Sequence, residues 1–151
     1  ARVAVQPSFL MNHVYYWGAV FRDSILGADR AARLDRVASA YAAGLRPSLH
    51  SDYNVTEIHP LLSARTAVQR RLQADDTVLN DAECVSPEQA LAAITTHAAW
   101  QIHADDRGCL AVGQRADFAV VSDDPWTSEP DAWPEITVGE TYLDGTPAYQ
   151  G

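Results

Sequence analysis

Extended and helical segments alternate along the first hundred residues, and this order is what most constrains the fold. Alternating valines predict a first strand over Arg2–Gln6, which Pro7 ends because proline has no N–H for ladder pairing. Apolar residues at helical spacing predict a helix over Arg30–Ala43 that stops at Gly44, and the run Arg46–His50 predicts a second strand. Strands joined through a helix pair in parallel by a right-handed crossover, so the sequence predicts an α/β fold.

Two further helices are expected after the second strand. Pro60 suits the first turn of a helix that runs to about Leu72, and Ser86–Gln89 has the pattern of a capping box that begins another. The last of these helices is expected to bury one apolar stripe, made of Leu91, Ile94, Ala98 and Ile102. The aromatic-rich segment Ser8–Gly27 has no clean helical period and is expected to be a loop.

From Gly108 onward the pattern becomes that of a small β unit. A short apolar strand is expected at Asp117–Val121. The segments Ile136–Leu143 and Thr146–Tyr149 flank Asp144-Gly145, which is typical of a hairpin with a type I′ turn. The sequence therefore predicts antiparallel pairing in this region.

The charge pattern excludes several classes of partner. The chain has 20 acidic residues against 11 basic ones, all arginine, and its net charge is −9. The arginines are scattered, and only Arg70 and Arg71 are adjacent, so no basic patch is expected for nucleic acid or an anionic membrane surface. With no apolar run of the roughly 18–20 residues that span a bilayer and no signal peptide, we expect a soluble cytoplasmic protein. Cys84 and Cys109 are expected to be buried free thiols.

His50 and Asp52 form the most specific local candidate for chemistry. If the second strand continued through them, both side chains would point to the same side at its carboxyl end. Active sites of parallel α/β folds assemble at that end, where a carboxylate can bind a metal or take a proton from water. The alternative is that Asp52 caps a turn and His50 fills a gap in the core.

His13 lies in the aromatic segment after the first strand, beside Tyr16 and Trp17. These residues suit an apolar substrate pocket, although such segments also pack as lids. The other histidines are expected to be structural, at a helix cap or on different helix faces: His59, His97 and His103.

Several motifs together resemble the last part of the barrel in metal-dependent amidohydrolases. The matching segments are Val5–Ser8, Asn12–Gly18 and Leu49–Tyr53. The segment Gly108–Ser122 resembles that superfamily's G-x-L-x-x-G-x-x-A-D strand motif. The chain is most similar in pattern to amidohydrolase family 3, in the subgroup of the N-substituted formamide deformylases.

The resemblance implies the C-terminal fragment of a distorted (β/α)8 TIM barrel. Residues 1–107 would hold its last two strands with their helices, and residues 108–151 part of a small β-sandwich. The full-length enzyme would use a divalent metal, usually zinc, and a metal-activated water to hydrolyse amide-type C–N bonds of a small molecule. Asp52 matches the aspartate that binds metal and shuttles the proton. The substrate would be faced by His13, Tyr16, Trp17 and His50.

The departures from the family pattern shape these expectations. The His-x-His motif, the bridging Lys or Glu and the remaining His ligands of the family have no counterpart here, and a barrel needs about 250 residues. We therefore expect a missing N-terminal barrel portion as partner, no bound metal or turnover in the isolated chain, and self-association through unpaired sheet edges. Two alternatives stay open: an acidic stand-alone α/β binding module without catalysis, and one half of a split amidohydrolase.

Overall fold

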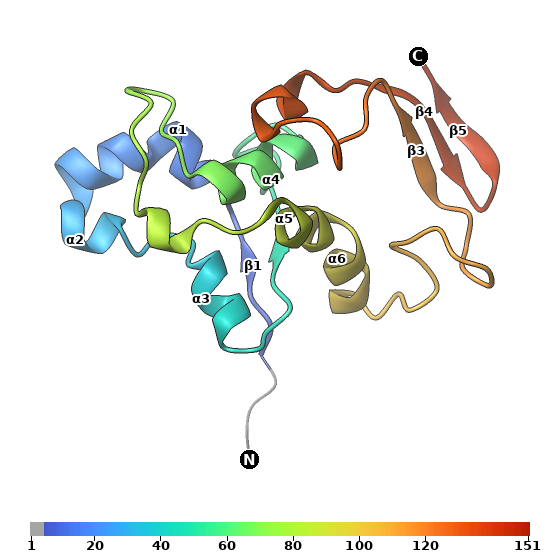
Figure 1. Cartoon of the computed structure of the whole chain (residues 1–151), viewed down its shortest axis with the longest axis horizontal. Helices are drawn as coiled ribbons and strands as arrows, with labels where there is room; N and C mark the ends of the chain where they lie inside the picture. Colours follow the sequence, from blue (N-terminus) through green and yellow to red (C-terminus); the bar gives the residue numbers. More distant parts are fainter. Residues whose placement is uncertain (1–4) are drawn as a thin grey trace.

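Two short parallel strands lie among the helices of a computed structural model that describes residues 5–151 (Figure 1). β1 (Ser8–Phe9) pairs in parallel with β2 (Ser48–Leu49), as predicted from the element order. The first strand begins after Pro7 and not before it. Although Pro7 has no N–H to donate, its carbonyl still takes part in the pairing, because it accepts a hydrogen bond from the Ser48 N–H at 3.1 Å. Of the strand predicted over Arg2–Gln6, residues 2–4 lie outside the described residues, and Val5 and Gln6 are not in a strand.

Short helices connect the two strands. They are α1 (Asn12–Val20), the π-helical turn η1 (Phe21–Ile25), α2 (Ala28–Ala31) and α3 (Val37–Ala42). The prediction of a loop over Ser8–Gly27 is therefore wrong, because most of this segment is helical. The apolar pattern of α1 was hidden because its core-facing residues, which include Val14 and Gly18, alternate with aromatic residues that are half-buried on its other side. The helix predicted over Arg30–Ala43 is interrupted at Asp35, where the backbone is left-handed with φ +45°, whereas Gly44 with φ +75° ends α3 as predicted.

The next helices agree better with the sequence. They are α4 (Pro60–Gln69), the 3-10 turn η2 (Asp81–Glu83), α5 (Pro87–Ile94) and α6 (Thr96–Gln101). The capping box of α5 is present: Ser86 accepts from the Gln89 N–H and the Gln89 side chain accepts from the Ser86 N–H. The backbone breaks at Thr95, between α5 and α6, which turns the second helix away from the predicted stripe. Ile102, predicted to be buried, is consequently 73% exposed.

The C-terminal region forms a separate antiparallel sheet, seen at one side of Figure 1. It contains β3 (Phe118–Val121), β4 (Val138–Leu143) and β5 (Thr146–Gln150), in that order. Asp144 and Gly145 have φ values of +52° and +74°, which confirms the predicted turn. Cys84 is half-buried, and Cys109 is exposed in the loop before β3, so the prediction of two buried thiols is wrong.

The described strands do not close into a barrel, since residues 5–151 hold the β1–β2 pair and the β3–β5 sheet. The fold is mixed α/β. Across the same residues, the helices are too short or too polar to span a bilayer.

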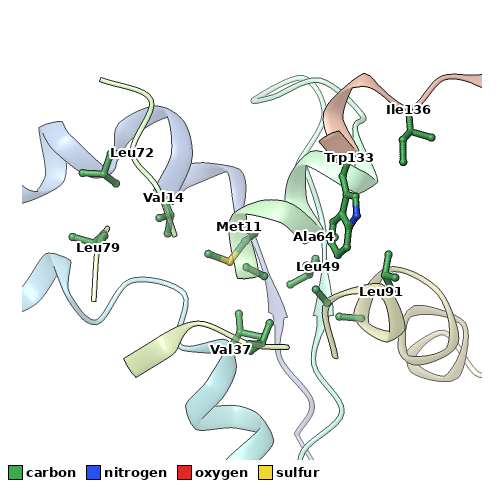
Figure 2. Packing of buried hydrophobic residues seen from close by; sticks show 14 of the residues in the cluster. Met11, Val14, Val37, Leu49, Ala64, Leu72, Leu79, Leu91, Trp133 and Ile136 are labelled. Atoms are coloured by element: carbon green, nitrogen blue, oxygen red, sulfur yellow. The ribbon is translucent and has the colours of Figure 1, made fainter. Parts of the chain in front are cut away.

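One hydrophobic core joins the helices to the C-terminal region (Figure 2). Met11, Leu49 and Leu91 bring together the start of α1, β2 and α5. Trp133, from the 3-10 helix η3 (Pro130–Glu135), is fully buried in the same cluster, and its indole N–H donates to the Ser128 carbonyl at 3.2 Å. The segment before β4 is therefore anchored against the helices that carry the candidate site.

The buried Arg70 holds the left-handed Asp35 in place between α2 and α3. Arg70 is fully buried, and its guanidinium donates to the carbonyl oxygens of Leu79, Asp35 and Leu34 at 2.7–2.9 Å. Burial raises the pKa of the neighbouring Asp35 carboxyl from 3.8 to about 6, against the opposing attraction of Arg70. Asp35 therefore binds a proton more readily in the folded protein than in the unfolded chain.

We expect Asp35→Asn to stabilise the protein at pH 7 by about 2 kcal/mol and to have little effect near pH 4. Because the pKa of Asp35 is raised on folding, its stabilising protonation is complete below pH 3.8 and is lost as the pH rises through 6. Asparagine cannot ionise, so it avoids this loss. Urea unfolding of wild type and variant at both pH values measures the difference. Asp76→Asn is the control, because Asp76 is exposed and also left-handed, with φ +58°. A gain of equal size at both pH values would contradict the electrostatic cause.

Candidate functional site

The residues predicted to carry chemistry meet at one edge of the β1–β2 pair. Since the strands are parallel, the start of α1 after β1 and the loop after β2 leave at the same end (Figure 1). His13 lies in the first turn of α1, and His50 and Asp52 lie in the loop after β2. The pKa of His13 is lowered, chiefly by burial and also by the neighbouring His50, while the Asp52 carboxylate acts in the opposite direction. The three side chains are therefore within electrostatic reach of one another.

The chain turns at Asp52, shortly after the second strand. β2 ends at Leu49, and Asp52 is left-handed with φ +50°, in a turn where its carbonyl accepts from the Val55 N–H at 2.6 Å. The strand does not continue through His50 and Asp52, so the condition for placing both side chains on one side of a strand is not met, and Asp52 lies in a turn, as in the alternative interpretation. The idea that His50 fills a core gap is wrong, since His50 is exposed. The chemical roles suggested for both residues stay predictions.

A buried polar network holds this loop against the helices, and the sequence analysis missed it. The Asn12 side-chain amide donates to the Thr56 hydroxyl and accepts from the Ser63 hydroxyl, both at 2.9 Å. The Thr56 hydroxyl in turn donates to the Ser51 carbonyl at 2.6 Å. Asn12, Thr56 and Ser63 are all buried, so each depends on the others for its hydrogen bonds. The network fixes the loop that carries Asp52 to the beginning of α1 and to α4.

Asp52 lines a cavity of about 370 Å³. Other residues around it are His50, Tyr53, His59 and Ser63. The predicted substrate residues Tyr16 and Trp17 line a neighbouring cavity of about 430 Å³, to which Tyr53 also contributes. His13 packs edge-on against Trp17, with ring centroids 5.2 Å apart. The structure thus places His50 and Asp52 in one cavity and Tyr16 and Trp17 in an adjoining one, whereas His13 lines neither and contacts the second through Trp17.

Two of the remaining histidines have contacts that account for structural roles, whereas His103 is exposed and its predicted structural role stays a prediction. His59 caps α4, with Nδ1 accepting from the Leu62 N–H at 3.3 Å and Nε2 lying 3.1 Å from the Pro134 carbonyl. His97 Nδ1 lies 3.2 Å from the Tyr41 hydroxyl.

The described residues do not fit a complete metal site. Within residues 5–151, no group of three or more His, Cys, Asp or Glu side chains could hold an ion. Asp52 offers one exposed carboxylate, with His50 and His13 nearby. By itself such a carboxylate can accept a proton from water or a hydrogen bond from a ligand.

The sequence is similar to amidohydrolases, both by family profile and by comparison with single proteins. The sequence profile described as "Amidohydrolase family" matches residues 1–149. The N-substituted formamide deformylase of Arthrobacter pascens is 32% identical over 138 residues, which cover 89% of this chain and 25% of that protein.

Two solved structures share the fold. An amidohydrolase from Thermotoga maritima MSB8 aligns with a TM-score of 0.59 at 19% identity, over 85% of this chain and 27% of that one. An adenosine deaminase from Xanthomonas campestris, solved with bound zinc, aligns with a TM-score of 0.58 at 20% identity, over 76% and 28%. This chain spans about a quarter of the length of these relatives. The chain belongs to the amidohydrolase family.

Proposed function

We propose that this chain is part of a hydrolase that cleaves amide-type C–N bonds of a small molecule, with Asp52 as its proton-transferring carboxylate. One observation carries the proposal: Asp52 opens into a cavity at the carboxyl edge of the parallel pair, beside His13 and His50. Catalytic residues of parallel α/β folds gather at this edge. Family membership supports the reaction class.

In the proposed reaction, water adds to the amide carbon and the C–N bond breaks to give a carboxylic acid and an amine. The Asp52 carboxylate accepts the proton that the attacking water loses and returns it to the leaving nitrogen. His50, His13, Tyr16 and Trp17 contact the substrate. The buried network through Asn12 keeps the Asp52 loop in place during the reaction.

The proposal extends to a divalent metal, zinc in the first instance. Since the described residues make no complete site, the other ligands would come from residues outside this sequence, and Asp52 would be this chain's one contribution. In the same proposal, β1 and β2 are the last strands of a distorted (β/α)8 barrel within residues 1–107, and residues 108–151 are part of a β-sandwich. The solved relatives support this placement through the fold alone.

The test compares the complete natural protein that carries these residues with the 151-residue chain alone. We expect the complete protein to release amine from simple N-substituted amides, to contain metal by elemental analysis, and to lose activity on chelation. The isolated chain should do none of these. Amide hydrolysis by the isolated chain with stoichiometric zinc would overturn the division of the site, and a metal-loaded complete protein inactive on all such amides would overturn the reaction class.

A further inference from the structure

We propose that the cavity of about 430 Å³ beside the Asp52 site binds an organic ammonium group. This cavity is called the aromatic cavity below, and its lining includes Tyr16, Trp17, Tyr53, Val55 and Glu57. Nothing in the reaction proposed above requires it to recognise a positive charge. The residues that line the aromatic cavity support the binding of a cation by themselves.

The walls suit a cation with an apolar shell. Tyr16 and Trp17 lie on α1 with ring centroids 5.7 Å apart and planes inclined by 56°, so the two rings do not stack face to face. Tyr53, from the loop after β2, is 70% exposed and contributes a third aromatic ring. Aromatic faces attract alkylammonium groups through their quadrupoles, and an ammonium ion with methyl substituents also gains from burial of its apolar surface.

The charge of the aromatic cavity also favours a cation. Glu57 is the one carboxylate in its lining, and no arginine or histidine of residues 5–151 joins it there. The Tyr16 pKa is raised mainly by burial, then by Tyr15 and by the Glu57 carboxylate, which places that charge close to the aromatic wall. Glu57 is exposed and forms no ion pair with an arginine of the part of the chain that the structure describes. Its charge is thus available to a ligand.

The position of Tyr53 connects the aromatic cavity with the proposed reaction. Tyr53 lines both this cavity and the one that contains Asp52. A substrate whose amide lies at Asp52 could therefore place a substituent against Trp17 and Glu57. If the proposed function holds, on which this step rests, the preferred substrates carry an ammonium substituent near the amide.

The test uses two ligands of equal shape and different charge. Choline is titrated into the complete protein that carries this chain, in parallel with its neutral isostere 3,3-dimethylbutan-1-ol, and binding is followed by ligand-observed NMR. We expect choline to bind about five to ten times more tightly than the isostere. Glu57→Gln should remove this preference, whereas Glu129→Gln, which alters an exposed carboxylate outside the aromatic cavity, should keep it. Trp17→Leu should weaken choline binding about tenfold.

Equal binding of the two ligands to the wild-type protein would overturn the proposal, as would a Glu57→Gln variant that keeps the preference. Neither result depends on turnover, so the proposed hydrolase activity would stand or fall separately. Conversely, an inactive protein that still prefers choline would leave the aromatic cavity established and refute the hydrolase.

Discussion

Replacing Asp52 with asparagine in the complete protein is expected to lower kcat/KM for amide hydrolysis by about a thousandfold. Asparagine has nearly the same size and can still accept a hydrogen bond, but it cannot take a proton from water at neutral pH. General acid–base groups typically contribute between about a hundredfold and ten-thousandfold to rate. Steady-state kinetics on the best substrate found for the wild type measures the effect.

The structure offers a close control for this substitution. Asp52 is exposed and left-handed with φ +50°, a conformation that asparagine adopts readily. The melting temperature of Asp52→Asn should therefore equal that of the wild type. Asp144→Asn makes the same change at φ +52° in the hairpin turn between β4 and β5. It should leave kinetics unchanged. Activity of Asp52→Asn within tenfold of the wild type would refute the proton-transfer role.

Local patterns were sufficient where neighbouring residues determine the structure. The capping box at Ser86, the start of α4 at Pro60 and the turn at Asp144-Gly145 were all predicted, because each depends on backbone conformation and hydrogen bonds within a few residues. The parallel pairing of β1 with β2 followed from the order of elements. These features needed no knowledge of distant contacts.

The breaks between helices could not be predicted for the opposite reason. The chain leaves the helical path at Asp35, where the carbonyls of Leu34 and Asp35 accept from Arg70, a residue 35 positions later. No local signal marks a residue whose conformation depends on so distant a donor. The helical period of α1 was likewise blurred, because aromatic side chains cover the face that the core does not use.

In the candidate site, too, the order of elements could be used for prediction, whereas contacts between residues far apart in the sequence could not. His13 and Asp52 could be brought together in advance because each follows a strand of a parallel pair. The network that fixes the Asp52 loop could not, since Asn12 is 44 residues from Thr56 and 51 from Ser63. The one signal in the sequence is that Asn12 is a polar residue between the apolar Met11 and Val14, which the structure buries completely.

Arg70→Leu is expected to destabilise the protein by about 3–5 kcal/mol, the largest stability effect that we predict. Leucine would leave the buried carbonyl of Leu79 and the partly buried carbonyls of Leu34 and Asp35 without their donor. It would also remove the charge that opposes the rise in the Asp35 pKa. Arg70 is left-handed with φ +50°, but leucine disfavours that conformation no more than arginine does, so backbone strain should contribute little to the difference.

Urea unfolding at pH 7 measures this loss, and the adjacent arginine supplies the control. Arg71 has 41% of its side chain exposed and pairs with Asp76 at the surface, so Arg71→Leu should cost less than about 1 kcal/mol. Arg70→Lys separates charge from geometry: it keeps the positive charge, but its single ammonium group cannot span the three carbonyls that the guanidinium reaches. We expect Arg70→Lys to lose most of the stability that Arg70→Leu loses. Near-wild-type stability of Arg70→Lys would instead assign the role of Arg70 to its charge beside Asp35.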